Sequence, residues 1–580
     1  MNSPKIFQLF PPIHKAEDFD IYDFQKIFND EETKRIIREG QTIGCFYIES
    51  PGMRSLLKKM KSDSFEMLTA ISSVIRPGVA ESGMMAEFIA RHHDPSRRKY
   101  LVPELEPLLK ETYGVMIYQE DVIKVAHYVA GLSLEEADLL RRAMSGKMRS
   151  HEAMRKLKDK FFDHCLKKYS KEITEELWRQ IESFAGYAFC KAHSASFALL
   201  SFQNAYLKAH FPAEFMSSIL TNQGGYYSAA VYVQESKRMG LKILLPDVNE
   251  SEIEYTGKDN WIRIGLMAIK NLSHSTIEKI VSERNKNGKY KSLRDFLRRT
   301  GIGYVETKIL IQCGAMDSLG SVILDNLGSI TSDNNLLLAG RFLNQKVKDE
   351  RIDENSSVLL IRPLLMRLLD VELYHRKISQ TDTLNFFEDD EQYLKELIKT
   401  INLNTIRKYS IAQICKIEYE TFGYMVSRHP LEFYNQFLKD KSITTACDLP
   451  DNKGKKVKAV GWLMTSKRIR TRKGDIMKFL SLEDLKGTFE AVIFPKEYQK
   501  YAPLTLSMGP YLIEGNVDNE LGDTIVVKSL IVLSTRIALR TQQIDDAENI
   551  FINTEKTIED EFKLIEEIAD DMVYKQLINF

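Results

Sequence analysis

The residues best suited to chemistry lie between Phe184 and Pro212, where cationic and aromatic side chains alternate with small residues. The cationic or proton-switchable donors of this run are Lys191, His193, Lys208 and His210. Its flat aromatic faces are Phe184, Tyr187, Phe189, Phe197, Phe202 and Tyr206. Nucleotides and nucleic acids use both kinds of surface, because they combine charged phosphates with planar bases. The run therefore indicates a surface for bases and phosphates, although aromatic residues at such spacings also line ordinary cores.

A second group of cations lies at the end of an expected helix. Ser133 followed by Glu136 matches a capping box, and good helix formers follow, so we expect a helix over Leu134 to Met144. Four cations lie near or just beyond its C-terminal end, namely Arg141, Arg142, Lys147 and Arg149. Such a group suits a triphosphate or a nucleic-acid backbone. A solvated helix end that complements the helix dipole fits the same pattern, so composition leaves both interpretations open.

Composition and cysteine spacing narrow the class of protein. Lys plus Arg and Asp plus Glu number 81 each among 580 residues, so any basic surface must be local. The six cysteines lie far apart with no CxxC pair, which argues against a zinc ribbon and a disulfide framework. The first residues lack an apolar signal sequence, and no apolar run reaches about 18 residues. We therefore expect a multidomain cytoplasmic protein with no membrane span and no metal site of its own.

The expected elements change in type along the chain. Helical spacing of apolar residues continues to about residue 225, short strands are expected within 240–265, and helices return at Ser275–Lys286 and Ser292–Thr300. Residues 326–357 are rich in Asn, Ser and Asp, which predicts a flexible joint. Five short alternating segments within 456–535 predict a small antiparallel barrel. The fold class is thus multidomain α + β, mainly α-helical and followed by a β-barrel.

The first turn of the expected barrel carries a dense basic patch. It consists of Lys467, Arg468, Arg470, Arg472 and Lys473. Trp462 and Phe479 are the aromatic partners expected on the adjoining strands. Small barrels of this type bind single-stranded nucleic acid through such loops and faces, and a plain solvated hairpin is the alternative.

Three long motifs together carry a family resemblance. They are IGCFYIESPGMRSLLKKM at 43–60, YGVMIYQEDVIKVAHYVAGLSLEEADLLRRAMSGK at 113–147 and FAGYAFCKAHSASFALLSFQNAYLKAHFPAEF at 184–215. They resemble the DNA polymerase III alpha family of C-family bacterial polymerases, downstream of its palm domain. The resemblance continues in family order through IRPGVAESGMM (75–85), LKILLPDVNES (241–251), IGLMAIKNLSHSTIEKIV (264–281), LIQCGAMDSLG (310–320), FGYMVSRHPLEFY (422–434) and the barrel.

The resemblance implies a domain order and a set of contact residues. The implied domains are a linker at 1–29, fingers at 30–225, a helix-hairpin-helix region at 226–325, a joint with a clamp-binding region at 326–445, an OB-fold at 446–535 and an acidic helical tail at 536–580. In this family the basic fingers helix faces the phosphates of the incoming nucleotide. That implies nucleotide-phosphate contacts for Arg141, Arg142, Lys147, Lys191 and His193. The basic barrel turn, with Trp462 and Phe479, is the expected DNA-binding surface.

Several positions depart from the family pattern. The first hairpin reads Asn271-Leu272-Ser273-His274, without the glycines that let backbone amides approach phosphate. The expected sliding-clamp peptide, QTDTLNFF, is irregular and offers Gln380, Leu384, Phe386 and Phe387. The sequences Ser145-Gly146-Lys147-Met148 and Cys190-Lys191-Ala192-His193 are nearer to the error-prone branch of the family.

The carboxylates of catalysis form the largest departure. In this family palm aspartates hold two Mg²⁺ ions, and the matching positions would lie upstream of residue 1. We therefore expect no catalytic or metal-binding residue in this chain, and Mg²⁺ is implied only for an assembled polymerase. Asp18-Phe19-Asp20 mimics the Asp-x-Asp arrangement, but it stands before GCFYIES, where the family has a connector.

Two functions follow as expectations. The first is the fingers-to-OB portion of a DNA-directed DNA polymerase, acting in replication or error-prone repair synthesis with palm aspartates from elsewhere. Its partners would be primer-template DNA, single-stranded template, a sliding clamp and a separate palm-containing chain. The second is a non-catalytic DNA- and clamp-binding accessory, or a decayed fragment.

Overall fold

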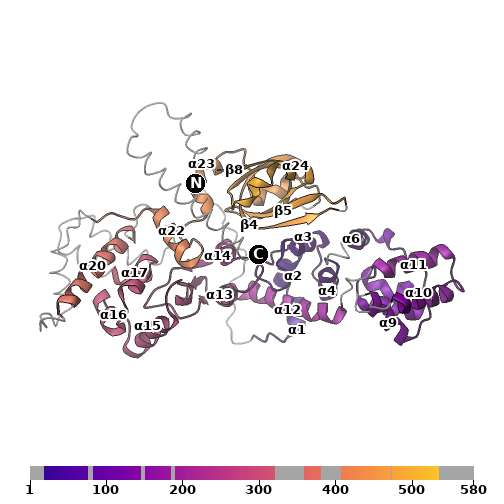
Figure 1. Cartoon of the computed structure of the whole chain (residues 1–580), viewed down its shortest axis with the longest axis horizontal. Coiled ribbons are helices and arrows are strands. Elements are labelled where there is room, and N and C mark those ends of the chain that lie inside the picture. The colour runs from indigo at the N-terminus through magenta and orange to yellow at the C-terminus, as the bar shows by residue number, and fades with distance from the viewer. Residues whose placement is uncertain are drawn as a thin grey trace. The chain divides into compact units, whose positions relative to one another are not determined.

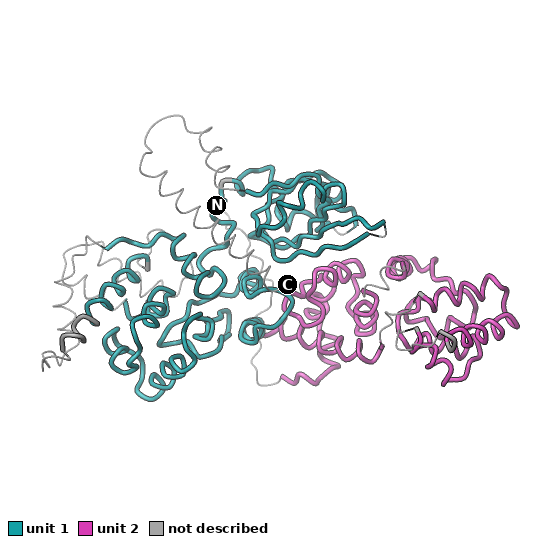
Figure 2. The backbone as a smooth tube through the Cα atoms, viewed as in Figure 1, with its two compact units in different colours: residues 1–11, 212–580 teal, residues 12–211 magenta. Residues whose placement is uncertain are grey.

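The computed structural model describes residues 19–75, 83–144, 151–183, 190–320, 358–379, 406–471, 473–520 and 522–533. They fall into two compact units, one within residues 12–211 and one within residues 212–580 (Figure 2). No helix among these residues is long and apolar enough to cross a membrane.

The unit within 12–211 is built from helices (Figure 1). Its α-helices are α1 (Phe24–Asn29), α2 (Glu31–Arg38), α3 (Pro51–Met60), α4 (Phe65–Val74), α6 (Met84–His93), α7 (Leu105–Leu109), α8 (Gln119–Lys124), α9 (Leu134–Met144), α10 (His151–Cys165), α11 (Lys171–Ser183) and α12 (Lys191–His210). The long helix α12 packs against α4 and α2. Helices α7 to α11 surround a separate apolar core that includes Phe161 and Trp178.

Helix α9 has the bounds that its capping residues predict. The Ser133 N–H donates to Glu136 Oε2 at 3.0 Å, and the Glu136 N–H donates to Ser133 Oγ at 3.2 Å. This reciprocal pair satisfies two N–H groups that the first turn of a helix leaves without a partner. The predicted helix over Leu134 to Met144 is therefore confirmed, and its arginines lie in the last turn.

The second unit begins with helices and a small sheet. Helices α13 (Pro212–Asn222) and α14 (Ala229–Arg238) precede strands β1 (Lys242–Leu244), β2 (Thr256–Lys258) and β3 (Trp261–Arg263). The strand order is β1-β3-β2, with β1 and β3 parallel and β2 antiparallel to β3. The predicted short strands within 240–265 are thus confirmed.

Further helices of this unit follow the small sheet along the chain. They are α15 (His274–Asn287), α16 (Leu293–Thr300), α17 (Tyr304–Gln312), α20 (Val358–Ser379), α22 (Ile411–Phe422) and α23 (Asn435–Leu438). Helix α20 packs against α17 and α16. The predicted helices at 275–286 and 292–300 agree with α15 and α16, whereas the predicted joint at 326–357 lies outside the described residues.

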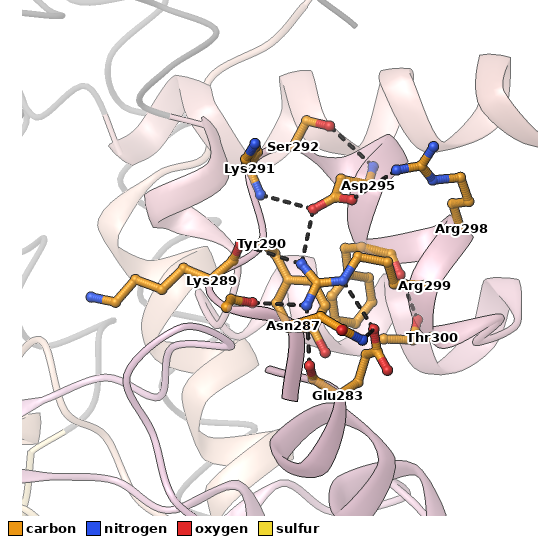
Figure 3. Close-up of polar contacts among 12 residues, drawn as sticks. Glu283, Asn287, Lys289, Tyr290, Lys291, Ser292, Asp295, Arg298, Arg299 and Thr300 are labelled. Atoms are coloured by element: carbon orange, nitrogen blue, oxygen red, sulfur yellow. Dashed lines mark hydrogen bonds and ion pairs between the residues drawn. The ribbon is translucent and has the colours of Figure 1, made fainter. Parts of the chain in front are cut away.

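Arg299 fixes the loop between α15 and α16 (Figure 3). Its guanidinium lies 4.4 Å from the centroid of the Tyr290 ring. It donates to Asp295 Oδ2 at 3.1 Å, to Glu283 Oε1 at 3.1 Å and to the Gly288 carbonyl at 2.7 Å. One planar donor group therefore holds both helices and the loop between them, which suits arginine better than lysine.

The C-terminal part of this unit is a closed barrel. Its strands are β4 (Lys456–Arg470), β5 (Ile476–Glu483), β6 (Thr488–Ile493), β7 (Tyr511–Val517) and β8 (Thr524–Val532), with α24 (Pro495–Tyr501) between β6 and β7. They close in the order β4-β5-β6-β8-β7, and only the β6–β8 pair is parallel among these strands. The predicted five-stranded barrel is confirmed, and this arrangement is consistent with an OB-fold.

A buried ionic group joins the barrel to the helices of the same unit. Arg238 on α14 donates through Nη1 to Glu483 Oε2 on β5 at 2.8 Å, and both side chains are buried. His429 accepts a hydrogen bond from the Leu431 N–H at Nδ1 and places Nε2 3.4 Å from Glu483 Oε1. Since Arg238 donates to one oxygen of Glu483 and His429 lies near the other, the buried charge of Glu483 is compensated at this junction.

Candidate functional site

The two arginines of the basic helix share one carboxylate. Arg141 Nε donates to Asp138 Oδ1 at 2.9 Å, and Arg142 Nε lies 2.8 Å from Asp138 Oδ2. The hydrogen bond from Arg141 is the main reason that the pKa of Asp138 lies below its ordinary value. The Arg142 side chain is 61% exposed and that of Arg141 is 21% exposed, so the two cations differ in how far they reach solvent.

Lys191 lies at the N-terminus of α12 and contacts two glutamates. Its backbone N–H donates to Glu120 Oε2 at 3.0 Å, and its Nζ donates to Glu111 Oε2 at 2.6 Å. The same Nζ lies 5.4 Å from the centroid of the Tyr118 ring, within the range of a cation–π contact. The cation is therefore held near the start of a 20-residue helix, where the helix dipole also favours anions.

Helix α8 connects these two cationic groups. Gln119 Oε1 accepts a hydrogen bond from Arg141 Nη1 at 3.0 Å. The next residue, Glu120, accepts the Lys191 N–H and also the Cys190 thiol at 3.3 Å. Sequence reasoning missed Gln119 and Glu120, although both stand in the family motif at 113–147. Arg141 and Lys191 are far apart in sequence, yet they hydrogen-bond to two consecutive residues of α8, Gln119 and Glu120.

His193 belongs to an aromatic group near the start of α12. Its ring centroid lies 4.1 Å from that of Phe197. Phe197 in turn meets Phe46 and Tyr47 edge-on, at 5.2 and 4.9 Å between centroids. Phe46 is exposed, so the group offers one aromatic face to solvent.

Two other cations of the same run have structural roles. Lys208 is buried and donates to the carbonyl oxygens of Gln41 and Ile43, each at 2.8 Å. His210 Nε2 lies 3.0 Å from Asp30 Oδ2. The expectation that these two side chains face a ligand is corrected by their inward contacts, and the predicted surface narrows to Lys191 and His193.

The first hairpin has an asparagine at a left-handed backbone position. Asn271 adopts a left-handed φ of 63°, a conformation that asparagine tolerates better than most residues. Ser273 follows as the N-cap of α15, and its N–H donates to Glu306 Oε1 at 3.2 Å. A carboxylate of α17 therefore lies at the N-terminus of α15.

The second hairpin has the glycines that the first one lacks. Gly301-Ile302-Gly303 joins α16 to α17, and Gly301 has a left-handed φ of 62°. A side chain added at Gly301 would come within 3.7 Å of Lys279 Nζ, so a cation lies beside this turn. Sequence reasoning overlooked this G-x-G signal between two helices, which is typical of a helix-hairpin-helix turn.

The barrel residues divide between surface and core. Lys467, Arg468, Arg470 and Lys473 are exposed at the end of the β4–β5 hairpin. Phe479 is half-buried and stands opposite Lys467 in the strand register. Trp462, in contrast, is 4% exposed and packs in the barrel core, so its ring cannot stack on a base in this conformation. The aromatic face available beside the cations is that of Phe479.

Several predicted residues lie outside the part of the chain that the structure describes. They are Phe184, Tyr187, Phe189, Lys147, Arg149, Arg472, Gln380, Leu384, Phe386, Phe387 and Asp18. Asp20 is described, and its carboxylate accepts the Tyr22 N–H in a local turn at 2.8 Å. Within the described ranges, no three His, Cys, Asp or Glu side chains gather as a metal site would require.

Comparison with known proteins gives two domain-level matches. Residues 6–169 match the model of the bacterial DNA polymerase III alpha subunit finger domain. Residues 240–322 match the model of a helix-hairpin-helix motif, a range that includes both hairpin turns.

Longer matches are to DNA polymerase III subunit alpha from several bacteria. The protein from Borreliella burgdorferi is 34% identical over 501 residues, covering 85% of this chain and 40% of the relative. Those from Aquifex aeolicus and Staphylococcus aureus are 31% and 30% identical, covering 88% and 98% of this chain and 39% and 49% of the relatives. This chain thus spans less than half the length of these relatives. Its first part thus matches the finger domain of bacterial DNA polymerase III alpha subunits, and the chain is similar to those subunits across most of its own length.

Proposed function

We propose that this chain is the nucleotide- and DNA-binding portion, from fingers to barrel, of a DNA polymerase III alpha-type DNA-directed DNA polymerase. The observation that carries the proposal is the junction at α8, where Arg141 and the start of α12 are held by neighbouring residues. A triphosphate needs several cations fixed on rigid supports, and α9 and α12 supply them in the unit that holds the finger domain.

The remaining parts suit the proposed DNA substrate. A turn with two glycines leads into α17, which allows backbone N–H groups to approach a phosphate closely. The cationic end of the β4–β5 hairpin, with Phe479 beside it, suits a single-stranded template. We assign the duplex to the helix-hairpin-helix region and the single strand to the barrel.

The described residues do not fit the metal ions of polymerase chemistry. Two-metal catalysis needs closely placed carboxylates, and none gather in threes within the described ranges. The chain's own residues would bind and orient the nucleotide and DNA, and we propose that the carboxylates come from a palm domain. A separate palm-containing chain and a sliding clamp are the proposed protein partners, in the cytoplasm with the DNA.

Primer extension tests the proposal. The chain is combined with a palm-containing partner, Mg²⁺ and primer-template DNA, and incorporation is measured with and without each protein. Neither protein alone should extend the primer, whereas the pair should. The variant Arg142→Ala should raise the KM for nucleotide about tenfold or more, because a charge-assisted contact is lost, with template affinity unchanged.

The matched control is Lys171→Ala on α11, which removes an exposed cation of the same unit. It should leave both constants unchanged. Unchanged extension in Arg142→Ala would refute the nucleotide assignment. If the chain alone extends the primer and Asp20→Asn abolishes that extension, the catalytic carboxylates lie in this chain. DNA binding without extension by any pair would favour an accessory protein.

A further inference from the structure

The first two residues of α8 point their side chains toward different helices. Gln119 bonds Arg141, which is 22 residues away in sequence, and Glu120 bonds the Lys191 N–H, which is 71 residues away. Neither side chain is a cation, and neither would attract a phosphate by itself. Their contacts instead fix the groups that would.

The backbone that carries Gln119 and Glu120 is held firmly. The N–H groups of Ile117 and Tyr118 both donate to Asp121 Oδ2 at 2.9 Å. Tyr118 and Asp121 are buried, at 2% and 3% exposure, so the start of α8 is anchored in the core. Side chains that project from this turn therefore have a fixed origin.

Gln119 completes the restraint on Arg141. Asp138 accepts from Nε at 2.9 Å and lies 2.8 Å from Nη2, while Gln119 accepts from Nη1 at 3.0 Å. Each of the three guanidinium nitrogens therefore has one contact, either with Asp138 or with Gln119. The plane of the group is set before any ligand arrives.

Glu120 fixes the start of α12. Its two oxygens accept the Lys191 N–H at 3.0 and 3.2 Å, and one of them also accepts the Cys190 thiol. A carboxylate from a neighbouring helix therefore caps α12, where the side chain of its own N-cap residue makes no capping bond. The position of Lys191 depends on this cap.

We propose that Gln119 and Glu120 are positioning residues, which hold Arg141 and Lys191 at a fixed separation for binding the triphosphate of a nucleotide. The inference rests on the proposed function and deepens it. Binding to cations that are already oriented costs less ordering than binding to mobile ones. The pair therefore raises affinity without touching the ligand.

A double-mutant cycle on the full chain tests the role of Gln119. Equilibrium binding of dATP is measured for the wild type, Gln119→Ala, Arg141→Ala and the double variant. Gln119→Ala should weaken binding about fivefold in the wild-type background, as expected for one lost hydrogen bond, and should have no effect in the Arg141→Ala background. A loss of fold would instead weaken binding equally in both backgrounds, and that result would overturn the proposal.

Inorganic tripolyphosphate serves as a second probe. Since Arg141 is proposed to meet phosphate, Gln119→Ala should weaken tripolyphosphate binding by the same factor as dATP binding. An effect confined to dATP would place Gln119 at the base or sugar and overturn the assignment.

Two variants of Glu120 separate its charge from its capping bond. Glu120→Gln keeps an acceptor for the Lys191 N–H and should retain most of the affinity, whereas Glu120→Ala should lose about fivefold or more and expose the Lys191 amide to hydrogen exchange. The matched controls are Gln180→Ala, which removes the contact between Gln180 and Glu176 within α11, and Glu176→Gln, which removes a carboxylate charge from the same helix. Controls that weaken binding as much as the α8 variants would refute the inference.

The outcomes separate the inference from the proposed function. A wild-type chain that binds neither dATP nor tripolyphosphate overturns the proposed function, and the positioning role falls with it. If the wild-type chain binds dATP but the effects of Gln119→Ala and Arg141→Ala simply add in the double variant, only the positioning role is overturned.

Discussion

Arg362 on α20 and Asp317 at the end of the helix-hairpin-helix region form an ion pair in which the arginine is fully buried. Arg362 Nη2 donates to Asp317 Oδ2 at 2.9 Å and its Nε donates to Oδ1 at 3.1 Å, although the Arg362 side chain has no exposed surface. Arg362 Nη1 also donates to the Gln312 carbonyl at 3.2 Å. Gly314, with a left-handed φ of 93°, leaves the room that the guanidinium occupies.

Breaking this pair should destabilise the second unit strongly. Asp317→Asn leaves the buried Arg362 without its counter-charge, which costs about 3–5 kcal/mol of unfolding free energy. Urea unfolding followed by circular dichroism measures the loss. The double variant Asp317→Leu with Arg362→Met should be much closer to the wild type, because it removes both charges. Equal losses in the single and double variants would contradict this account.

Glu111 should compete with the proposed triphosphate for Lys191. The two side chains are 40% and 38% exposed, so their ion pair contributes less than about 1 kcal/mol to stability. Glu111→Gln should leave the melting temperature nearly unchanged and strengthen dATP binding about two- to fivefold, because Lys191 keeps its charge while its carboxylate partner is lost. Weaker binding in the variant would mean that Glu111 orients Lys191 for the ligand.

The hairpin of the barrel should bind single-stranded DNA through charge and stacking. Lys467→Ala should lower the slope of log affinity against log salt by about 0.7, the value for one phosphate contact on a single strand. Phe479→Ala should cost about 1–3 kcal/mol of binding if a base stacks there. Fluorescence anisotropy over a range of salt concentrations measures both. The control is Lys456→Ala, which lies on the same strand and pairs with Glu514 at 3.3 Å.

Because of Asp121, the first unit should become less stable as the pH rises from about 4 to about 6. Burial raises its pKa from 3.8 to about 6, although the N–H groups of Tyr118 and Ile117 oppose the change. The native state therefore holds the proton more tightly than the unfolded state, and stability falls between about pH 4 and pH 6. Asp121→Asn should remove this dependence and gain up to about 3 kcal/mol at pH 7. Chemical unfolding at several pH values checks the slope, and a slope retained in the variant would exclude Asp121 as its source.

Glu306 should weaken the binding of duplex DNA at the first hairpin. Its carboxylate accepts the Ser273 N–H at 3.2 Å and the Thr276 hydroxyl at 2.9 Å, where a DNA phosphate would approach α15. Glu306→Gln removes the negative charge and should strengthen duplex binding about threefold at low salt, with a smaller gain at high salt. Glu497→Gln on α24 is the matched control. Unchanged affinity in Glu306→Gln would show that the first hairpin does not face the duplex.

The sequence predicted helices and strands well where hydrogen bonds or alternation within a few residues determine them. The capping pair Ser133 and Glu136 predicted the start of α9 correctly, because both hydrogen bonds of the box form within one turn. The alternating segments of the barrel likewise predicted its five strands, since the period of two reflects which face each residue takes. The parallel β6–β8 pair could not be inferred, because strand order depends on contacts distant in sequence.

The residues that position the site were harder to predict, and physical reasons explain each case. Gln119 and Glu120 act on groups 22 and 71 residues away, and no periodicity encodes such contacts. Trp462 lies between Gly461 and Leu463, where no polar alternation indicates which face its ring takes, and the closure of the barrel buries it. Lys208 reads as a surface cation, and only the carbonyl oxygens of Gln41 and Ile43 reveal why its burial is tolerated.

The placement of the three tryptophans gives the protein a built-in set of optical reporters. Trp178 lies in the core formed by α7 to α11, Trp261 on β3 and Trp462 in the barrel. Each folded region therefore contributes its own emission, which shifts to longer wavelength when that region alone exposes its indole to water. Variants that retain a single tryptophan would report the order in which the fingers, the small sheet and the barrel come apart.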